Sequence, residues 1–155
     1  MSNITLDQPV ADFTAPATSN IDVSLAALKG NNVVIYFYPK DSTPGCTTEG
    51  QDFRDLHDQF KQQDTVIFGV SKDSLRSHEN FKAKQAFPFE LICDESEALC
   101  QLFDVIKEKS MYGKTFMGIE RSTFVIDKEG VLRKEWRKVK VKGHAEEVLK
   151  TVQEL

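Results

Sequence analysis

The chain has 155 residues, of which 40% are hydrophobic and 28% are charged, and its formal net charge is −4. This length fits one domain that buries its own core, so we expect a single domain over residues 1–155. The acidic balance argues against nucleic acid or an anionic membrane as a partner, and no apolar run is long enough to span a bilayer. Three cysteines without a Cys-x-x-Cys pair, and an N-terminus without a secretory pattern, indicate a cytoplasmic protein.

The first half of the chain predicts a strand, a helix and a second strand. Residues 33–38 and 65–71 are short apolar runs without alternation, which is typical of strands covered on both faces of a sheet. Between them, Phe53, Leu56 and Phe60 are spaced to lie on one face of a helix. This order and spacing indicate a parallel βαβ unit with a right-handed crossover.

The middle of the chain continues the alternation of helices and strands. A second helix is expected to begin after Asp73 or Ser74. A short strand is predicted over residues 89–92, and a helix is predicted around residues 99–103.

The last third predicts a loop, a hairpin and a closing helix. Residues 107–117 are polar and contain glycine and lysine, so we expect a loop there. Residues 122–126 and 131–136 read as an antiparallel hairpin, and residues 145–152 form an amphipathic helix. Together these elements predict an α/β fold of the thioredoxin-like type, with a central mixed sheet and helices on both faces.

The stretch around Cys46 reads as the first turn of a helix. Pro44 suits the first helical position, because its missing N–H would have no partner there. Thr43 would then be the N-cap and Cys46 the third helical residue. Unpaired amides and the positive end of the helix dipole favour a thiolate at this position, and the thiolate is the nucleophilic form of cysteine.

The pattern Pro39-x-x-x-Thr43-x-x-Cys46 resembles the active-site motif of the peroxiredoxins. Residues 41–49, DSTPGCTTE, are similar to the bacterioferritin-comigratory protein (Bcp), or peroxiredoxin Q, branch of that family. Further similar segments lie at residues 111–114, 118–127 and 136–144. The resemblance spans nearly the whole chain and implies a thioredoxin-like fold and a thiol peroxidase that reduces hydrogen peroxide and organic hydroperoxides without a metal or other cofactor.

The match to the family motif also implies a role for each residue. Cys46 would attack one peroxide oxygen, while the other leaves as hydroxide or alkoxide. The amides of Gly45 and Cys46 and the hydroxyl of Thr43 are close enough in sequence to hold the peroxide. Arg121, expected on a strand beside the active-site strand, would stabilise both the thiolate and the leaving oxygen. Pro39 would shield the sulfur from water.

The chain departs from the family at the resolving cysteine. Many peroxiredoxin Q proteins carry this residue five positions after the catalytic cysteine, where this chain has Gln51, or on the next helix near residues 81–83, where it has none. From this departure we predict a one-cysteine cycle completed by thioredoxin, glutaredoxin or glutathione. The resemblance implies a monomer. Cys100 is expected to be a buried structural thiol, and a disulfide from Cys46 to Cys93 or Cys100 is the alternative.

A different class of function is a thioredoxin-fold redox sensor or chaperone-like protein without significant turnover. A sensor has no need of an arginine that stabilises a leaving group, so the combination of Thr43, Cys46 and Arg121 favours an enzyme. A dithiol oxidoreductase fits less well, because Thr43 occupies the position of the second cysteine of a Cys-x-x-Cys pair.

Other polar residues are given ordinary structural interpretations. Glu49 lies in the first helical turn, where it would complement the dipole or assist from outside the site. His57, His78 and His144 show no common metal-ligand spacing and are expected to be solvated. The basic stretch 133–142 is explained by an exposed strand rather than by nucleic-acid binding.

Overall fold

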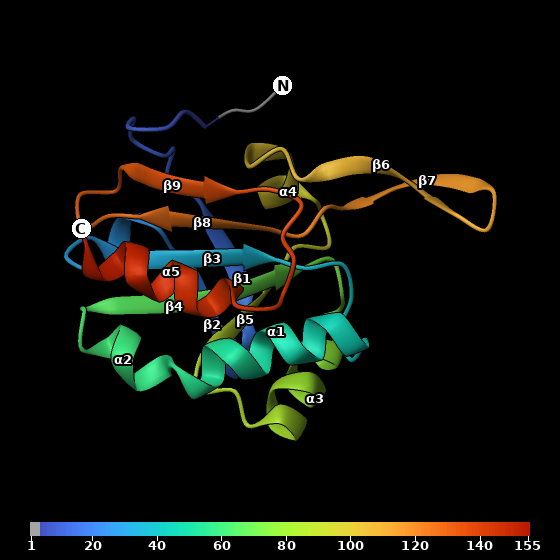
Figure 1. The fold of residues 1–155 in the computed structure, drawn as a ribbon, viewed down its shortest axis with the longest axis horizontal. Coiled ribbons are helices and arrows are strands. Elements are labelled where there is room, and N and C mark those ends of the chain that lie inside the picture. Colours follow the sequence, from blue (N-terminus) through green and yellow to red (C-terminus); the bar gives the residue numbers. More distant parts are fainter. Residues whose placement is uncertain (1–3) are drawn as a thin grey trace.

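A seven-stranded mixed sheet forms the centre of the computed structural model, which describes residues 4–155 (Figure 1). The strand order is β2-β1-β5-β4-β3-β8-β9, and β6 and β7 pair separately. The strands are β1 Thr14–Ala17, β2 Ile21–Ser24, β3 Asn32–Phe37, β4 Thr65–Ser71, β5 Glu90–Cys93, β6 Ile106–Met111, β7 Lys114–Ile119, β8 Ser122–Ile126 and β9 Leu132–Trp136. The α-helices are α1 Pro44–Asp55, α2 His57–Lys61, α3 Leu75–Gln85, α4 Ala98–Leu102 and α5 His144–Gln153.

The predicted βαβ unit is confirmed. β3 and β4 are parallel with Val33 opposite Val66, and β8 pairs antiparallel with β3 on its other side. Every residue of β3 is buried, because strands flank it on both edges and side chains cover both faces. This burial explains why its sequence is continuously apolar rather than alternating.

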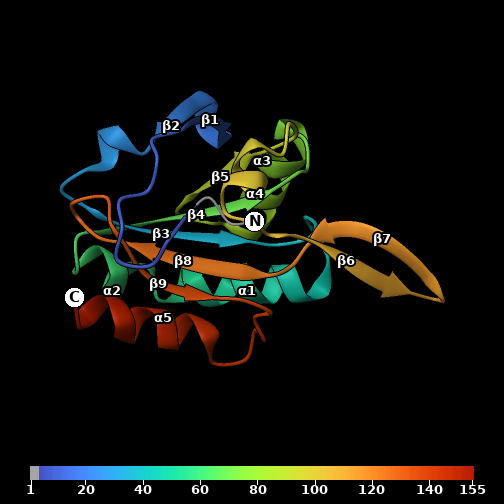
Figure 2. The same ribbon diagram turned by 90° about the horizontal axis from the view of Figure 1, so that it is seen from above.

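Helices cover both faces of the sheet, as predicted. On one face, α1, α2, α3 and α5 bury aromatic and aliphatic side chains against the sheet, among them Phe53, Phe60 and Phe81. Figure 2 shows α1, α2 and α5 side by side on this face. On the other face, Leu99 and Phe103 at α4 pack with the N-terminal strands.

The helix predicted through Phe53, Leu56 and Phe60 is divided in two. Leu56, with φ −99° and ψ 1°, caps the end of α1 and precedes α2. Phe53 and Phe60 both remain buried, so the predicted face is retained across the break.

The prediction of a loop over residues 107–117 is wrong. β6 and β7 form a hairpin with Lys109 opposite Phe116, joined by Tyr112 and Gly113, which both have positive φ. Two such residues suit the tight turn that matches strand twist. Most side chains of this hairpin are exposed on both faces, so no pattern of hydrophobic alternation marks the strands. The prediction also omitted β1 and β2, which are short and joined to the sheet through the single register pair Ala17–Ile92.

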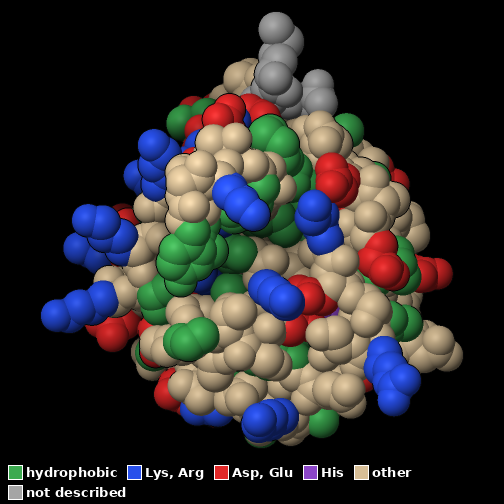
Figure 3. All heavy atoms as spheres, turned by 90° about the vertical axis from the view of Figure 1, so that its right-hand side faces the viewer, with side chains coloured by type: hydrophobic (Ala, Val, Ile, Leu, Met, Phe, Trp, Pro, Cys, Tyr) green, Lys and Arg blue, Asp and Glu red, His purple; other side chains and the backbone are tan. Residues whose placement is uncertain are grey.

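One end of the sheet collects the segments that matter for chemistry. The parallel strands β3, β4 and β5 all finish there, α1 begins there, and the β6–β7 hairpin projects from the same end (Figure 1). Figure 3 faces this end and shows hydrophobic side chains gathered among lysines and arginines. Within residues 4–155, every helix is too short or too polar to cross a bilayer.

Candidate active site

Cys46 occupies the predicted position in the first turn of α1. Thr43 is the N-cap residue and Pro44 the first helical residue, which places Cys46 third. The first α-helical hydrogen bond is donated by the Thr47 amide to the Thr43 carbonyl over 2.9 Å. The preceding amides of Gly45 and Cys46 are therefore available to a ligand beside the sulfur. The Cys46 side chain is 2% exposed, so the sulfur lies in a water-poor setting.

Arg121 contacts the Cys46 sulfur from a different element of the fold. It directly precedes β8, whose first residue, Ser122, pairs with Phe37 at the end of β3. Its Nη2 donates to Cys46 Sγ over 3.4 Å, and its Nη1 donates to Glu49 Oε1 over 2.6 Å. The predicted proximity of Arg121 and Cys46 is therefore present. Glycine at position 45 makes room for this approach, because a Cβ there would lie 3.1 Å from Nη2.

Glu49 lies within the active site, whereas the sequence suggested a role from outside it. It lies one helical turn beyond Cys46 and is 1% exposed. Burial raises the pKa of Glu49 to about 7, although the neighbouring Arg121 guanidinium acts to lower it. Its position three residues after Cys46 could have indicated this proximity, since residues three apart share a helix face.

Lys109 is a site neighbour that sequence reasoning missed. It lies on β6, within the segment predicted to be a loop. Burial and the charge of Arg121 lower the pKa of Lys109, while Cys46 acts to raise it. The hairpin thus brings a second cation toward the Cys46 sulfur, and no local motif marks it.

Thr43 and Pro39 lie in the loop between β3 and α1. The Thr43 hydroxyl donates to the Lys40 carbonyl over 2.7 Å, and no hydrogen bond between the described residues joins it to Cys46. Pro39 is half-buried two residues beyond β3. The structure therefore brings Arg121 directly to the sulfur and leaves Thr43 bonded within its own loop.

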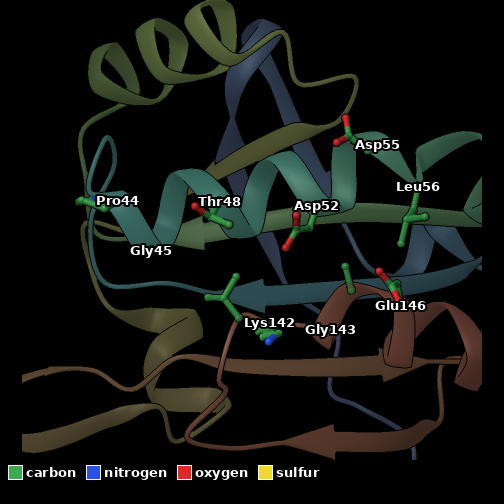
Figure 4. Close-up of a pocket in the computed structure, with 11 residues that line it drawn as sticks. Pro44, Gly45, Thr48, Asp52, Asp55, Leu56, Lys142, Gly143 and Glu146 are labelled. Carbon is green, nitrogen blue, oxygen red and sulfur yellow. The ribbon is translucent and has the colours of Figure 1, made fainter.

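A groove of about 620 Å³ extends from this loop along α1 (Figure 4). Pro44 and Gly45 lie at one end and Leu56 at the other, and Asp52 and Glu146 face each other across it. Burial, Asp55 and Glu146 raise the pKa of Asp52. Gly45, the residue before Cys46, lines the groove, and Cys46 itself does not.

Comparison with known proteins identifies the family. Residues 6–135 match the model of the AhpC/TSA family. Peroxiredoxin Bcp of Xanthomonas campestris pv. campestris is 54% identical over 151 residues, which cover 96% of this chain and 94% of that protein. The chain belongs to the Bcp/peroxiredoxin Q group of the AhpC/TSA peroxiredoxins. It is a thiol peroxidase.

Further relatives agree with this assignment. Peroxiredoxin Bcp of Bacillus subtilis is 51% identical over 152 residues, covering 98% of this chain and 97% of that protein. The solved structure of Xanthomonas campestris peroxiredoxin Q has a TM-score of 0.90 and 51% identity, covering 99% of this chain and 98% of that one. A cysteine-to-serine mutant of Xylella fastidiosa PrxQ has a TM-score of 0.93 and 42% identity, with coverages of 99% and 98%. The predicted family and thioredoxin-like fold are confirmed.

The other cysteines of this peroxiredoxin are protected from ionisation. Burial and the Glu95 carboxylate raise the pKa of Cys93, whose thiol donates to the Asp73 carbonyl over 3.3 Å. Burial and Asp94 raise the pKa of Cys100 far above its usual range. Cys100 is fully buried, as expected for a structural thiol. All three cysteines of the chain are unpaired.

The expectation of three solvated histidines is wrong. His78 is fully buried and lies 2.7 Å from Asp41, and His144 is buried with its Nε2 2.8 Å from Thr123 Oγ1. Burial lowers the pKa of His144 to about 4. Only His57 is partly exposed. His78 lies on α3, which is mostly polar, so no hydrophobic pattern indicated its burial. His144 begins α5 four residues before buried Val148, so its place on the apolar face of that helix was an available signal.

Proposed function

We propose that Cys46 reduces hydrogen peroxide and organic hydroperoxides, alkyl hydroperoxides included. The observation that carries this proposal is the contact of Arg121 with the Cys46 sulfur beside two helix N-terminal amides. The Xanthomonas campestris bacterioferritin comigratory protein, which is 51% identical to this chain, has alkyl peroxide reduction activity. The groove along α1 is compatible with larger substrates, because it begins at Pro44 and Gly45, next to Cys46 in the chain.

In the proposed reaction, the Cys46 thiolate attacks the nearer peroxide oxygen and the O–O bond breaks. Sulfur is oxidised to a sulfenic acid, and the departing oxygen takes a proton and leaves as water or an alcohol. Arg121 and the amides of Gly45 and Cys46 stabilise the charge that develops on the two oxygens. Thr43 orients the peroxide through its hydroxyl, and Pro39 shields the sulfur from water.

We further propose that an external thiol completes the cycle. It attacks the sulfenic acid, releases water and forms a mixed disulfide, which a second thiol then reduces to restore Cys46. Thioredoxin, glutaredoxin or glutathione has the required chemistry. In support, Gln51 holds the usual resolving position and is hydrogen-bonded to Gln85 of α3 over 2.9 Å, and the pKa of both Cys93 and Cys100 is raised.

The proposed setting is a monomer of one domain in the cytoplasm. Both core clusters pack on faces of the same sheet, which supports one domain over residues 1–155. Three unpaired cysteines support a reducing compartment.

Peroxide consumption with dithiothreitol as the donor tests the activity. Wild-type protein should consume peroxide over many turnovers, and Cys46→Ser should consume none. Cys93→Ser is the matched control, because it removes a thiol that is not held near Arg121. A wild-type protein oxidised once without turnover would instead indicate a redox sensor.

Mass spectrometry after one equivalent of peroxide tests the one-cysteine cycle. The expected product has gained one oxygen and is trapped by dimedone at Cys46, as a sulfenic acid would be. Loss of two hydrogens, with a peptide joining Cys46 to Cys93 or Cys100, would overturn the one-cysteine proposal and leave the peroxidase proposal intact.

A further inference from the structure

A buried acidic residue anchors the loop that carries the active-site residues. Asp41 lies between β3 and Thr43 and is 5% exposed. Its Oδ1 accepts a hydrogen bond from the Tyr38 hydroxyl over 2.6 Å. Its Oδ2 accepts one from the Ser77 hydroxyl over 2.8 Å and lies 2.7 Å from His78 Nδ1. Ser77 and His78 belong to α3, so one carboxylate joins the loop to a separate helix.

Both ring nitrogens of His78 are hydrogen-bonded. Its Nε2 lies 3.0 Å from the carbonyl oxygen of Ile92, which can only accept, so Nε2 carries a proton. Its Nδ1 lies 2.7 Å from Asp41 Oδ2, and one proton is shared between these two atoms. Asp41 and His78 therefore form a buried hydrogen-bonded pair with side chains 2% and 0% exposed.

The same loop contains a strained residue. Ser42 has φ +62°, a left-handed conformation that a serine holds only when its surroundings impose it. On its N-terminal side, the Asp41 amide donates to Asp73 Oδ2 over 2.9 Å. On its C-terminal side, the Thr43 hydroxyl donates to the Lys40 carbonyl. Strain next to the N-cap of α1 would relax by moving Thr43 and Cys46.

We propose that Asp41, Ser77 and His78 form a clamp that positions the Cys46 loop for attack on the peroxide. These are positioning residues, since they act through the loop and touch neither sulfur nor substrate. The inference rests on the proposed peroxidase function. Without the clamp, the Ser42 turn relaxes. The N–H groups of Gly45 and Cys46 then no longer point at the peroxide, and the buried sulfur becomes accessible.

A cation site is the competing interpretation of this cluster, because ligand atoms of Asp41, Asp73 and His78 lie within 4.8 Å of one another. The hydrogen bonds argue against it. His78 Nδ1 is already hydrogen-bonded to Asp41 Oδ2, and Asp73 Oδ2 already accepts from the Asp41 amide and the Ser71 hydroxyl. The clamp uses the polar atoms that a cation would need.

The test compares two reactions of Cys46 in Asp41→Asn and in a matched control. Asp94→Asn makes the same chemical change at a carboxylate that is 3% exposed and accepts hydrogen bonds from the Leu99 and Cys100 amides, away from the loop. Asp41→Asn should slow the reaction with hydrogen peroxide by on the order of 10- to 100-fold, the range that a small misplacement of reacting groups produces. It should also speed alkylation by iodoacetamide, which needs an accessible sulfur and no positioned donors. Asp94→Asn should change neither rate.

Ser77→Ala keeps the proposal testable if Asp41→Asn does not fold, because it removes one half-buried donor and leaves the Asp41–His78 pair in place. Ser77→Ala should slow the peroxide reaction and speed alkylation, as Asp41→Asn does, but by a smaller factor. Ser77→Thr, which retains a hydroxyl, should restore both rates. Hydrogen exchange should show faster exchange over residues 40–47 in Ser77→Ala than in wild type. Wild-type peroxide and alkylation rates in a folded Asp41→Asn or Ser77→Ala would overturn the clamp. If the wild type itself does not react with peroxide, the proposed function fails, and the exchange measurement still decides whether the clamp holds the loop.

Discussion

Replacing Glu49 with glutamine should remove the part of the pH dependence of stability that comes from ionising this buried carboxyl group. Burial raises the pKa of Glu49 from its ordinary 4.5 to about 7. Between these values the folded protein binds more protons than the unfolded chain, so this residue makes stability fall as the pH rises. At about 1.4 kcal/mol for each pKa unit, ionising Glu49 costs the folded state about 3 kcal/mol above pH 7. Glutamine keeps an oxygen for the Arg121 hydrogen bond and has no charge to bury.

Urea unfolding of wild type and Glu49→Gln, at several pH values from 4.5 to 8, measures this term. The stability of the variant relative to wild type should increase by about 3 kcal/mol across that range. Subtracting the two curves is necessary, because His144 contributes a dependence of opposite sign to both proteins and cancels in the difference. A stability gap that stays constant with pH would refute the reasoning, since it would mean that Glu49 is ionised in the folded protein at the same pH as in the unfolded chain.

The remaining predictions concern Arg121 and His144. Arg121→Met should fold, as circular dichroism would show, and should reduce peroxide slower by on the order of 10²–10³-fold, because a charged donor is lost from a buried site; a wild-type rate would make the arginine purely structural. His144, whose pKa burial lowers to about 4, should make stability fall as the pH drops from 6.5 through 4, because the unfolded chain binds the proton first. In urea unfolding, His144→Gln should lose less stability than wild type as the pH drops over this range. An equal loss in both proteins would contradict the role given to His144.

The active-site turn could be predicted because its determinants are local. Thr43, Pro44 and Cys46 occupy their positions through backbone constraints that act within one helical turn. The buried strands could be predicted equally well, since a short, continuous apolar run in a small domain is typical of a strand covered on both faces. The placement of Arg121 needed both the family motif and the pairing of β8 with β3.

Other polar contacts that cross between elements could not be predicted. His78 and Asp41 are 37 residues apart, and only the packing of α3 against the loop brings them together. Lys109 interacts electrostatically with Arg121 and Cys46 from an exposed hairpin, and such a hairpin has no hydrophobic pattern to reveal it. These contacts depend on tertiary geometry, which local spacing does not encode.

The exposed edges of the β6–β7 hairpin have a consequence for strand pairing between copies of the chain. Each of its two strands has an unpaired outer edge, and Met111, Tyr112, Phe116 and Met117 are exposed on it. Free edges with apolar side chains are templates for intermolecular strand pairing and aggregation. Lysines at positions 107, 109 and 114 interrupt this hairpin. Lysines on two such hairpins would repel each other, so these side chains oppose strand pairing between copies at this arm.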